Sequence, residues 1–160
     1  MRYHNITKDD MLNGDGLRVV LWLSGCSHKC PGCQNPITWN PDDGLYFNEA
    51  AKEEIFKELE KDWISGITFS GGDPLHKNNF EEVYSLIQEI REKFPTKTIW
   101  LYSGYTYEYL KNNEDEALRR KIVESCDVFC DGPFIQDLKD NNIHWVGSSN
   151  QNVIRMKEEK

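Results

Sequence analysis

The sequence predicts an α/β fold with a mainly parallel sheet, because two kinds of segment alternate along the chain. Four short runs of β-branched and large apolar residues each stop at a turn sequence, as buried strands do. Between these runs, apolar residues recur at helical spacing. Strands that alternate with helices form βαβ units with right-handed crossovers, which place the strands parallel in one sheet.

The four expected strands cover residues 18–23, 66–70, 97–102 and 127–131. Glycine follows each of them within two residues, so each strand has turn chemistry at its carboxyl end. A closed (β/α)8 barrel takes about 250 residues. With four strands and at most one or two more, a chain of 160 residues is too short to close one, so we expect an incomplete (β/α) barrel that is open along one side.

Three helices are expected to accompany these strands. Asn48 is suited to cap the first, because its side chain can accept a hydrogen bond from an amide of the first turn. One side of this helix carries Ile55, Leu59 and Trp63. The second helix is predicted over residues 80–94 and the third over 109–123. The polar segment 141–152 is expected to pack against the fold, since it contains Trp145 and Val146.

Composition limits the class of protein. We expect one domain over residues 1–160, because no linker-like shift in composition divides the chain. The net charge of −8 disfavours nucleic acid as a partner, and the longest apolar run is far shorter than the roughly 20 residues that cross a bilayer. Five cysteines, an odd number, and an N-terminus without an apolar signal region favour a reducing cytoplasm over a disulfide framework.

Unusual sequences follow all four strands. In a parallel sheet, ligands bind beyond the carboxyl ends of the strands. A cysteine-rich segment, 25–33, follows the first strand and a Gly-Gly-Asp-Pro sequence follows the second. Ser103 and Asp131 stand at the ends of the third and fourth. We therefore expect four loops to converge on one site.

Cys26, Cys30 and Cys33 have the spacing Cys-x3-Cys-x2-Cys, which can bring three thiolates to zinc or to an iron–sulfur cluster. A structural zinc site would need a fourth ligand, such as His28 or a distant cysteine. A [4Fe–4S] cluster normally has four thiolates, so three would leave one iron open to a substrate. A thioredoxin-like redox pair at Cys30 and Cys33 is a further alternative.

The other two cysteines, Cys126 and Cys130, are expected to be ordinary buried residues. Placed four residues apart along one strand, they would be separated by about 13 Å, too far to share one tetrahedral zinc. The role of His28 is left open.

The Gly-Gly-Asp-Pro loop is suited to a cation. Gly71 and Gly72 let the backbone approach a ligand closely, so that their carbonyls can accept hydrogen bonds from an ammonium group. Asp73 offers a charge-assisted acceptor, and Pro74 stiffens the exit of the loop. The same dipeptides are common in ordinary turns, which is the alternative interpretation.

The cysteine spacing and the Gly-Gly-Asp-Pro loop together resemble the radical S-adenosylmethionine superfamily. Within it, the chain is similar to the branch that activates anaerobic ribonucleoside-triphosphate reductases, over about residues 13–154. The segments that carry this similarity are 13–18, 30–35, 131–134 and 147–151. Two positions depart from the usual pattern: Gly32 replaces an aromatic residue before the third cysteine, and Asp73 replaces a glutamate.

The resemblance implies an incomplete, laterally open (β/α) barrel of the radical-SAM type, with one [4Fe–4S] cluster and S-adenosylmethionine as cosubstrate. Reductive cleavage of this cosubstrate would give a 5′-deoxyadenosyl radical that generates a glycyl radical on the reductase. The implied partners are that reductase and a flavodoxin-type or similar electron donor, and homodimer formation is left open. An open barrel side would admit a loop of this protein substrate. Four tyrosines near one strand end either form a docking surface or pack internally: Tyr102, Tyr105, Tyr107 and Tyr109.

The resemblance also assigns residues. The cluster ligands would be Cys26, Cys30 and Cys33. The cosubstrate would contact Gly32, Cys33 and Gln34 beside the adenine, and Gly71, Gly72 and Asp73 at the methionine ammonium. Ser103 is a hydroxyl candidate for the ribose or carboxylate, with helix capping as the alternative. Asp131 either contacts the ligand or forms a turn, and Arg18 is interpreted as a charge at a strand edge. No catalytic residue beyond the cluster ligands is predicted.

Two other functions are compatible with the sequence. One is a small radical enzyme acting on a purine- or pterin-like molecule, which would share the compact open barrel. The other is a zinc-binding interaction module without catalysis.

Overall fold

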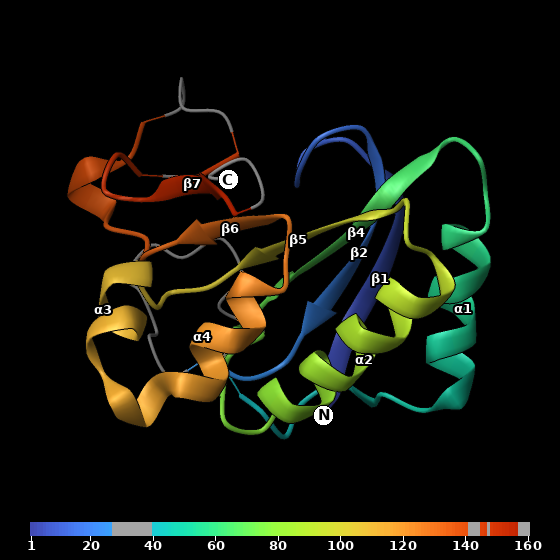
Figure 1. Cartoon of the computed structure of the whole chain (residues 1–160), viewed down its shortest axis with the longest axis horizontal. Coiled ribbons are helices and arrows are strands. Elements are labelled where there is room, and N and C mark those ends of the chain that lie inside the picture. The colour runs from blue at the N-terminus through green and yellow to red at the C-terminus, as the bar shows by residue number, and fades with distance from the viewer. Residues whose placement is uncertain (27–39, 141–144, 147, 157–160) are drawn as a thin grey trace.

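One mixed sheet organises the fold (Figure 1). The computed structural model describes residues 1–26, 40–140, 145–146 and 148–156. In these residues, seven strands form a single sheet in the order β3-β1-β2-β4-β5-β6-β7, with an edge at β3 and another at β7. The sheet is therefore open rather than closed, as expected.

The four strands predicted from the sequence form the centre of this sheet and are mutually parallel. They are β2 (Leu17–Leu23), β4 (Ile64–Gly71), β5 (Thr98–Tyr102) and β6 (Val128–Asp131). Three strands that were not located from the sequence extend the sheet with antiparallel pairing. They are β1 (Arg2–Asp10), β3 (Leu45–Tyr46) and β7 (Asn152–Arg155). Parallel pairing is thus confined to the central strands.

Helices cover one face of the sheet (Figure 1). They are α1 (Glu49–Leu59), α2 (Phe80–Lys93), α3 (Tyr107–Asn112) and α4 (Ala117–Glu124). Two 3-10 turns also occur, η2 (Glu114–Glu116) between α3 and α4 and η3 (Gln136–Leu138) after β6. Alternate strand residues such as Leu21, Phe69 and Leu101 form the main core with these helices. None of the helices in the described ranges is long and apolar enough to cross a membrane.

A smaller cluster packs on the opposite face of the sheet. Its buried members are Trp100, Val128 and Cys130. The indole of Trp145 meets that of Trp100 edge to face, with ring centroids 5.5 Å apart, and Val146 packs on the same cluster. This confirms the expectation that Trp145 and Val146 are packed against the fold.

The helix boundaries confirm some expectations and correct others. The Asn48 side chain caps α1 by accepting a hydrogen bond from the amide of Ala51, 3.0 Å away. Trp63 was wrongly assigned to the buried side of this helix, since α1 ends at Leu59 and Trp63 is exposed. The expected helix 109–123 is two helices, because Asn113 adopts an extended conformation and a 3-10 turn follows it.

Arg18 is fully buried, so its interpretation as a strand-edge charge is wrong. From β2 its guanidinium reaches across β4, donating to the Ile67 carbonyl (2.9 Å), and onward to the Thr98 carbonyl on β5 (2.7 Å). Gly66 leaves the space for this, since a Cβ there would collide with the Thr98 carbonyl and the guanidinium. Burial lowers the pKa of Arg18 to about 10. The side chain therefore joins three adjacent strands near their amino ends.

Replacing Arg18 with methionine should lower the free energy of unfolding by about 3 kcal/mol, because several buried oxygens lose their donors. Urea denaturation of the metal-free protein followed by circular dichroism measures this. Arg155→Met is the matched control: Arg155 makes a partly exposed ion pair with Asp15, 3.5 Å long, and its loss should cost about 1 kcal/mol or less. Equal costs for the two variants would contradict the role given to Arg18.

Candidate functional site

The loops after the four parallel strands meet at the end of the sheet that the carboxyl ends of these strands form, as expected. Because β2, β4, β5 and β6 are parallel, their carboxyl ends point the same way. The amide of Asp73 donates to the Gly25 carbonyl over 2.7 Å, joining the ends of β2 and β4. The amide of Ser103 donates to the Cys130 carbonyl over 3.1 Å, joining β5 and β6.

Asp73 connects three of these strand ends. Its side chain is almost completely buried. One carboxylate oxygen, Oδ1, accepts from the amide of Leu75 (2.8 Å), while Oδ2 accepts from Ser103 Oγ (2.9 Å) and the amide of Gly104 (3.0 Å). With its amide bonded to Gly25, the residue links the loops after β2, β4 and β5. The carboxylate thus fastens the loop after β5 to the loop after β4, and the backbone amide of Asp73 fastens the loop after β4 to the end of β2.

Ser103 does not cap the helix that follows it. That helix, α3, is capped by Thr106, whose hydroxyl accepts from the amide of Tyr109. The Ser103 hydroxyl instead donates to Asp73 and accepts from the amide of Tyr105 over 3.1 Å. The hydroxyl therefore fastens the loop after β5 to the loop after β4, and a contact with the cosubstrate stays a prediction.

Gly71 and Gly72 lie against the end of β2. The amide of Gly72 donates to the Leu23 carbonyl over 2.8 Å. Gly71 has φ +100°, and a Cβ there would collide with the backbone of Leu23. A side chain at this position is excluded by both conformation and space. Gly71 therefore has a clear structural role, beside the ammonium contact predicted for both glycines.

Of the predicted cluster ligands, the structure describes only Cys26. This thiol is partly exposed and stands directly beyond the carboxyl end of β2. Cys30 and Cys33 lie outside the described residues, as do Gly32, Gln34 and His28. A partly exposed cysteine thiol that forms no disulfide within the described ranges is suited to bind a metal as a thiolate, and three such donors fit zinc or an iron–sulfur cluster.

Cys126 and Cys130 are buried, as expected, but they do not share a strand. Cys126 precedes β6, and its thiol donates to the Ile122 carbonyl of α4 over 3.4 Å. Cys130 lies on β6, where burial raises its pKa to about 12. Both cysteines are thus packing residues on opposite faces of the sheet.

Asp131 forms the loop connections after β6. Its Oδ2 accepts from the amide of Tyr107 (2.9 Å), and its Oδ1 accepts from the amide and side chain of Asn152 (3.2 Å each). Of the two possibilities raised for this residue, the described contacts are those of turn formation. The carboxylate joins the start of α3 to β7.

The carboxyl-terminal Ser-Ser-Asn-Gln sequence clamps the Gly-Pro turn after β6. The side-chain Nδ2 of Asn150 donates to the Pro133 carbonyl (2.7 Å), and the side-chain Nε2 of Gln151 donates to the Gly132 carbonyl (3.0 Å). Ser148 is fully buried, and its hydroxyl accepts from the amide of Ile135. Two sequence elements that lie far apart in the chain therefore form one unit.

The four tyrosines differ in their surroundings. Tyr102 is largely buried, which raises its pKa, and Tyr107 packs edge to face on Phe129. Tyr105 stacks on Tyr109 with ring centroids 5.8 Å apart, and only Tyr109 is widely exposed. Tyr102 and Tyr107 therefore pack against the fold, whereas Tyr105 and Tyr109 line a small surface hollow, for which a docking role stays a prediction.

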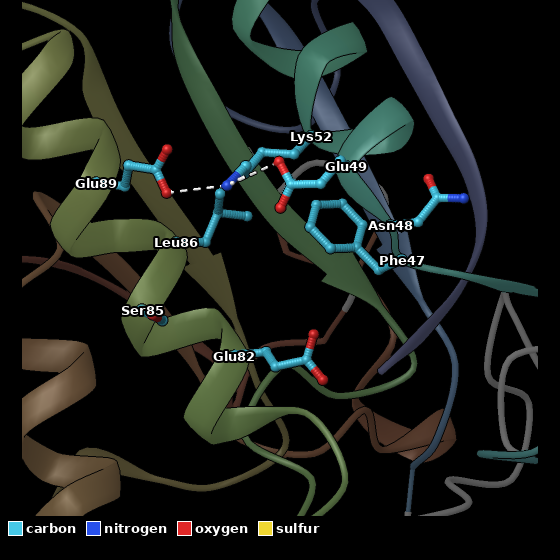
Figure 2. A pocket seen from close by; sticks show the side chains of 8 residues that line it. All are labelled: Phe47, Asn48, Glu49, Lys52, Glu82, Ser85, Leu86 and Glu89. Atoms are coloured by element: carbon cyan, nitrogen blue, oxygen red, sulfur yellow. Dashed lines mark hydrogen bonds and ion pairs between the residues drawn. The ribbon is translucent and has the colours of Figure 1, made fainter.

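A hollow of about 430 Å³ lies between α1 and α2 (Figure 2). It is lined by Phe47, Asn48, Glu49, Lys52, Glu82, Ser85, Leu86 and Glu89. The Lys52 ammonium lies between the carboxylates of Glu89 (3.2 Å) and Glu49 (3.3 Å). Glu89 also pairs with Lys93 (3.3 Å), and the Glu82 carboxylate pairs with the N-terminal ammonium (3.0 Å), so each acid that lines the hollow is already engaged by a cation of the chain.

Two residues beside the strand ends were missed from the sequence. Asn79 is buried, and its side-chain Nδ2 donates to the Ser24 carbonyl (2.8 Å) and the Asp73 carbonyl (3.0 Å). His76 is also buried in the same turn. The sequence feature that could have identified them as site residues is their position directly after the Gly-Gly-Asp-Pro loop.

Comparison with known proteins agrees with this arrangement. A family profile described as "4Fe-4S single cluster domain" matches residues 12–154. The chain is 43% identical over 155 residues to the anaerobic ribonucleoside-triphosphate reductase-activating protein of Escherichia coli strain K12, covering 96% of this chain and 97% of that one. The protein of the same name from Enterobacteria phage T4 is 39% identical over 153 residues, covering 96% of this chain and 93% of that one.

The protein of that name from Haemophilus influenzae is 36% identical over 159 residues, covering 98% of this chain and 99% of that one. These matches define the class as a protein with a single 4Fe–4S cluster domain. The chain belongs to the family of anaerobic ribonucleoside-triphosphate reductase-activating proteins.

The link between Asp73 and Ser103 can be tested by a double-mutant cycle. Ser103→Ala should lower the free energy of unfolding by about 1.5–3 kcal/mol, because a hydrogen bond to a charged group is lost. In an Asp73→Asn background the same substitution should cost much less, since the carboxylate is already absent. Urea denaturation of the metal-free variants gives the coupling. Equal costs in both backgrounds would show that the two side chains do not interact.

Alkylation should distinguish the described cysteines. In the native metal-free protein at pH 8, iodoacetamide should modify Cys26 and spare Cys126 and Cys130, because burial protects these two thiols and keeps Cys130 protonated. Peptide mass spectrometry locates the modified residues. Modification of all three in urea is the positive control, and rapid native modification of Cys130 would contradict the packing described.

Proposed function

We propose that this protein is an iron–sulfur activating enzyme that cleaves S-adenosylmethionine reductively and generates a glycyl radical on an anaerobic ribonucleoside-triphosphate reductase. The observation that carries the proposal is the bond between Asp73 and Gly25, which holds the Gly-Gly-Asp-Pro loop against the residue before Cys26. Membership of the activating-protein family supports the same conclusion. The open sheet is interpreted as an incomplete, laterally open barrel of the radical-SAM type.

In this proposal Cys26, Cys30 and Cys33 hold a [4Fe–4S] cluster. When bound and reduced, such a cluster supplies the electron that splits S-adenosylmethionine into methionine and a 5′-deoxyadenosyl radical, which takes a hydrogen atom from a glycine of the reductase. Three protein thiolates leave a coordination position for the cosubstrate. The protein's part is to position the groups and to exclude water.

The described residues fit the positioning role. The carbonyls of Gly71 and Gly72 are proposed to accept from the methionine ammonium, together with Asp73. Because the Asp73 carboxylate also accepts from Ser103 and Gly104, it fixes the path of the loop that presents these carbonyls. Ser103 is therefore proposed to act through Asp73. Its hydroxyl is also proposed to contact the ribose or carboxylate of the cosubstrate. Gly32, Cys33 and Gln34 are proposed to lie beside the adenine.

The proposed partners follow from the same chemistry. The protein substrate is the anaerobic reductase, whose glycine-bearing loop would enter from the open side of the sheet. A flavodoxin-type or similar electron donor is proposed as the source of the electron, and a reducing cytoplasm as the compartment.

The test is anaerobic reconstitution with iron and sulfide, followed by dithionite, S-adenosylmethionine and the reductase. We expect 5′-deoxyadenosine and a glycyl-radical doublet in the electron paramagnetic resonance spectrum. Cys26→Ala should abolish both by removing a cluster ligand. Cys126→Ala is the control, since this thiol lies in the core, and should retain both. Cleavage of S-adenosylmethionine without a glycyl-radical doublet would favour a small-molecule substrate. Protein that contains tightly bound zinc and no sulfide would contradict the redox function altogether.

A further inference from the structure

The backbone of the loop after β4 holds two of the three carbonyls that directly precede Cys26. The amide of Gly72 donates to the Leu23 carbonyl over 2.8 Å. The amide of Asp73 donates to the Gly25 carbonyl over 2.7 Å. Successive carbonyls of an extended chain point in opposite directions, so a backbone that pairs with these two is not placed to reach the carbonyl between them. The middle carbonyl therefore needs a donor from elsewhere in the fold.

That donor is the side chain of Asn79. Its Nδ2 donates to the Ser24 carbonyl over 2.8 Å and to the Asp73 carbonyl over 3.0 Å. The Ser24 amide donates to the Arg2 carbonyl of β1, which shows that Ser24 turns its backbone groups away from β4. Asn79 is only 1% exposed, so both hydrogen bonds are shielded from water. One buried side chain thus joins the residue two places before Cys26 to the Gly-Gly-Asp-Pro loop.

Asn79 gives up an ordinary helix cap to make this bridge. It is the N-cap residue of α2, a position where asparagine normally accepts a hydrogen bond from an amide of the first turn, as Asn48 does at α1. The Asn79 side chain makes no such bond. Within the described residues its Oδ1, the atom that would accept one, is buried without a hydrogen-bond partner. A buried polar atom without a partner is costly, so the local preference is overridden in favour of the bridge, as is typical of functional sites.

We propose that Asn79 is a positioning residue for S-adenosylmethionine, which sets the separation between the segment entering Cys26 and the Gly-Gly-Asp-Pro loop. This inference rests on the proposed function, in which the cosubstrate contacts both the cluster and that loop. Because one ligand then bridges two loops, an error in their separation weakens its binding even when each loop keeps its own conformation. Asn79 acts through the carbonyls of Ser24 and Asp73 and does not itself contact the cosubstrate.

Two substitutions remove the bridge and keep a residue that is suited to begin a helix. The side chain in Asn79→Ser is too short to reach both carbonyls. Asn79→Asp keeps the size of asparagine but replaces the Nδ2 donor with an oxygen. Serine and aspartate are both favourable N-cap residues, so α2 should keep its start in either variant. Asn48→Ala is the matched control, because it removes a helix cap at α1 and leaves the bridge intact.

The first measurement uses the metal-free protein and does not depend on the cluster. Hydrogen exchange is followed by nuclear magnetic resonance for the amide of Asp73, relative to that of Phe69 inside β4. In Asn79→Ser the amide of Asp73 should exchange roughly tenfold faster on this relative scale, because the loop is less firmly held to β2. In Asn48→Ala the ratio should equal that of the wild type. An unchanged ratio in Asn79→Ser would overturn the inference.

The second measurement is the dissociation constant of S-adenosylmethionine for the reconstituted protein, obtained by anaerobic equilibrium dialysis with iron and sulfide analysis. We expect a complete 4Fe–4S cluster in every variant. The dissociation constant should rise roughly tenfold in both Asn79 variants and stay unchanged in Asn48→Ala. A merely structural role would lower stability without this difference in affinity.

Wild-type affinity in fully loaded Asn79→Ser and Asn79→Asp would overturn the inference, as would an equal loss of affinity in Asn48→Ala. Failure of both Asn79 variants to take up the cluster would also overturn it, because Asn79 would then serve cluster binding rather than alignment. Absence of a cluster, or of cosubstrate binding, from the wild type would instead contradict the proposed function.

Discussion

The buried carboxylate of Asp73 is the interaction on which the candidate site depends. Its two oxygens accept three hydrogen bonds from Leu75, Ser103 and Gly104, while its amide holds Gly25. Hydrogen bonds to an ionised group are worth about 1.5–3 kcal/mol each, and a buried charge is costly when such donors are absent. The loops after β2, β4 and β5 are therefore held in one arrangement, with Cys26 and the two glycines side by side.

A second buried charge has the matching role at the other end of these strands. Arg18 extends from β2 across β4 to β5 near their amino ends, and Asp73 joins the same three strands at their carboxyl ends. Both side chains form their hydrogen bonds largely with backbone groups and hydroxyls rather than with an opposite charge. The sheet beneath the site is thus fixed at both ends, which suits the proposed alignment of a cofactor, a cosubstrate and another protein.

The sequence predicted the parts of this structure that local patterns determine. The strand β2 is largely buried on both faces and therefore contains a continuous apolar run over residues 19–23, whereas β1 is partly exposed and shows no such run. Arg18 was misjudged because a charge is rarely buried, and its partners lie about 50 and 80 residues away in the sequence. The positions of Cys26 and Asp73 after their strands were predictable, but the bonds from Asp73 to Ser103 and from Asn79 to Ser24 depend on tertiary structure.

Hydrogen exchange measures the central role of Asp73 most directly. In nuclear magnetic resonance spectra of the metal-free protein, the amides of Leu75 and Gly104 donate to this carboxylate and should be protected. In Asp73→Ala both should exchange faster, while the amide of Phe69 inside β4 keeps its protection. Unchanged protection of Leu75 and Gly104 would contradict the account, because it would show that the strand ends are held together without the carboxylate.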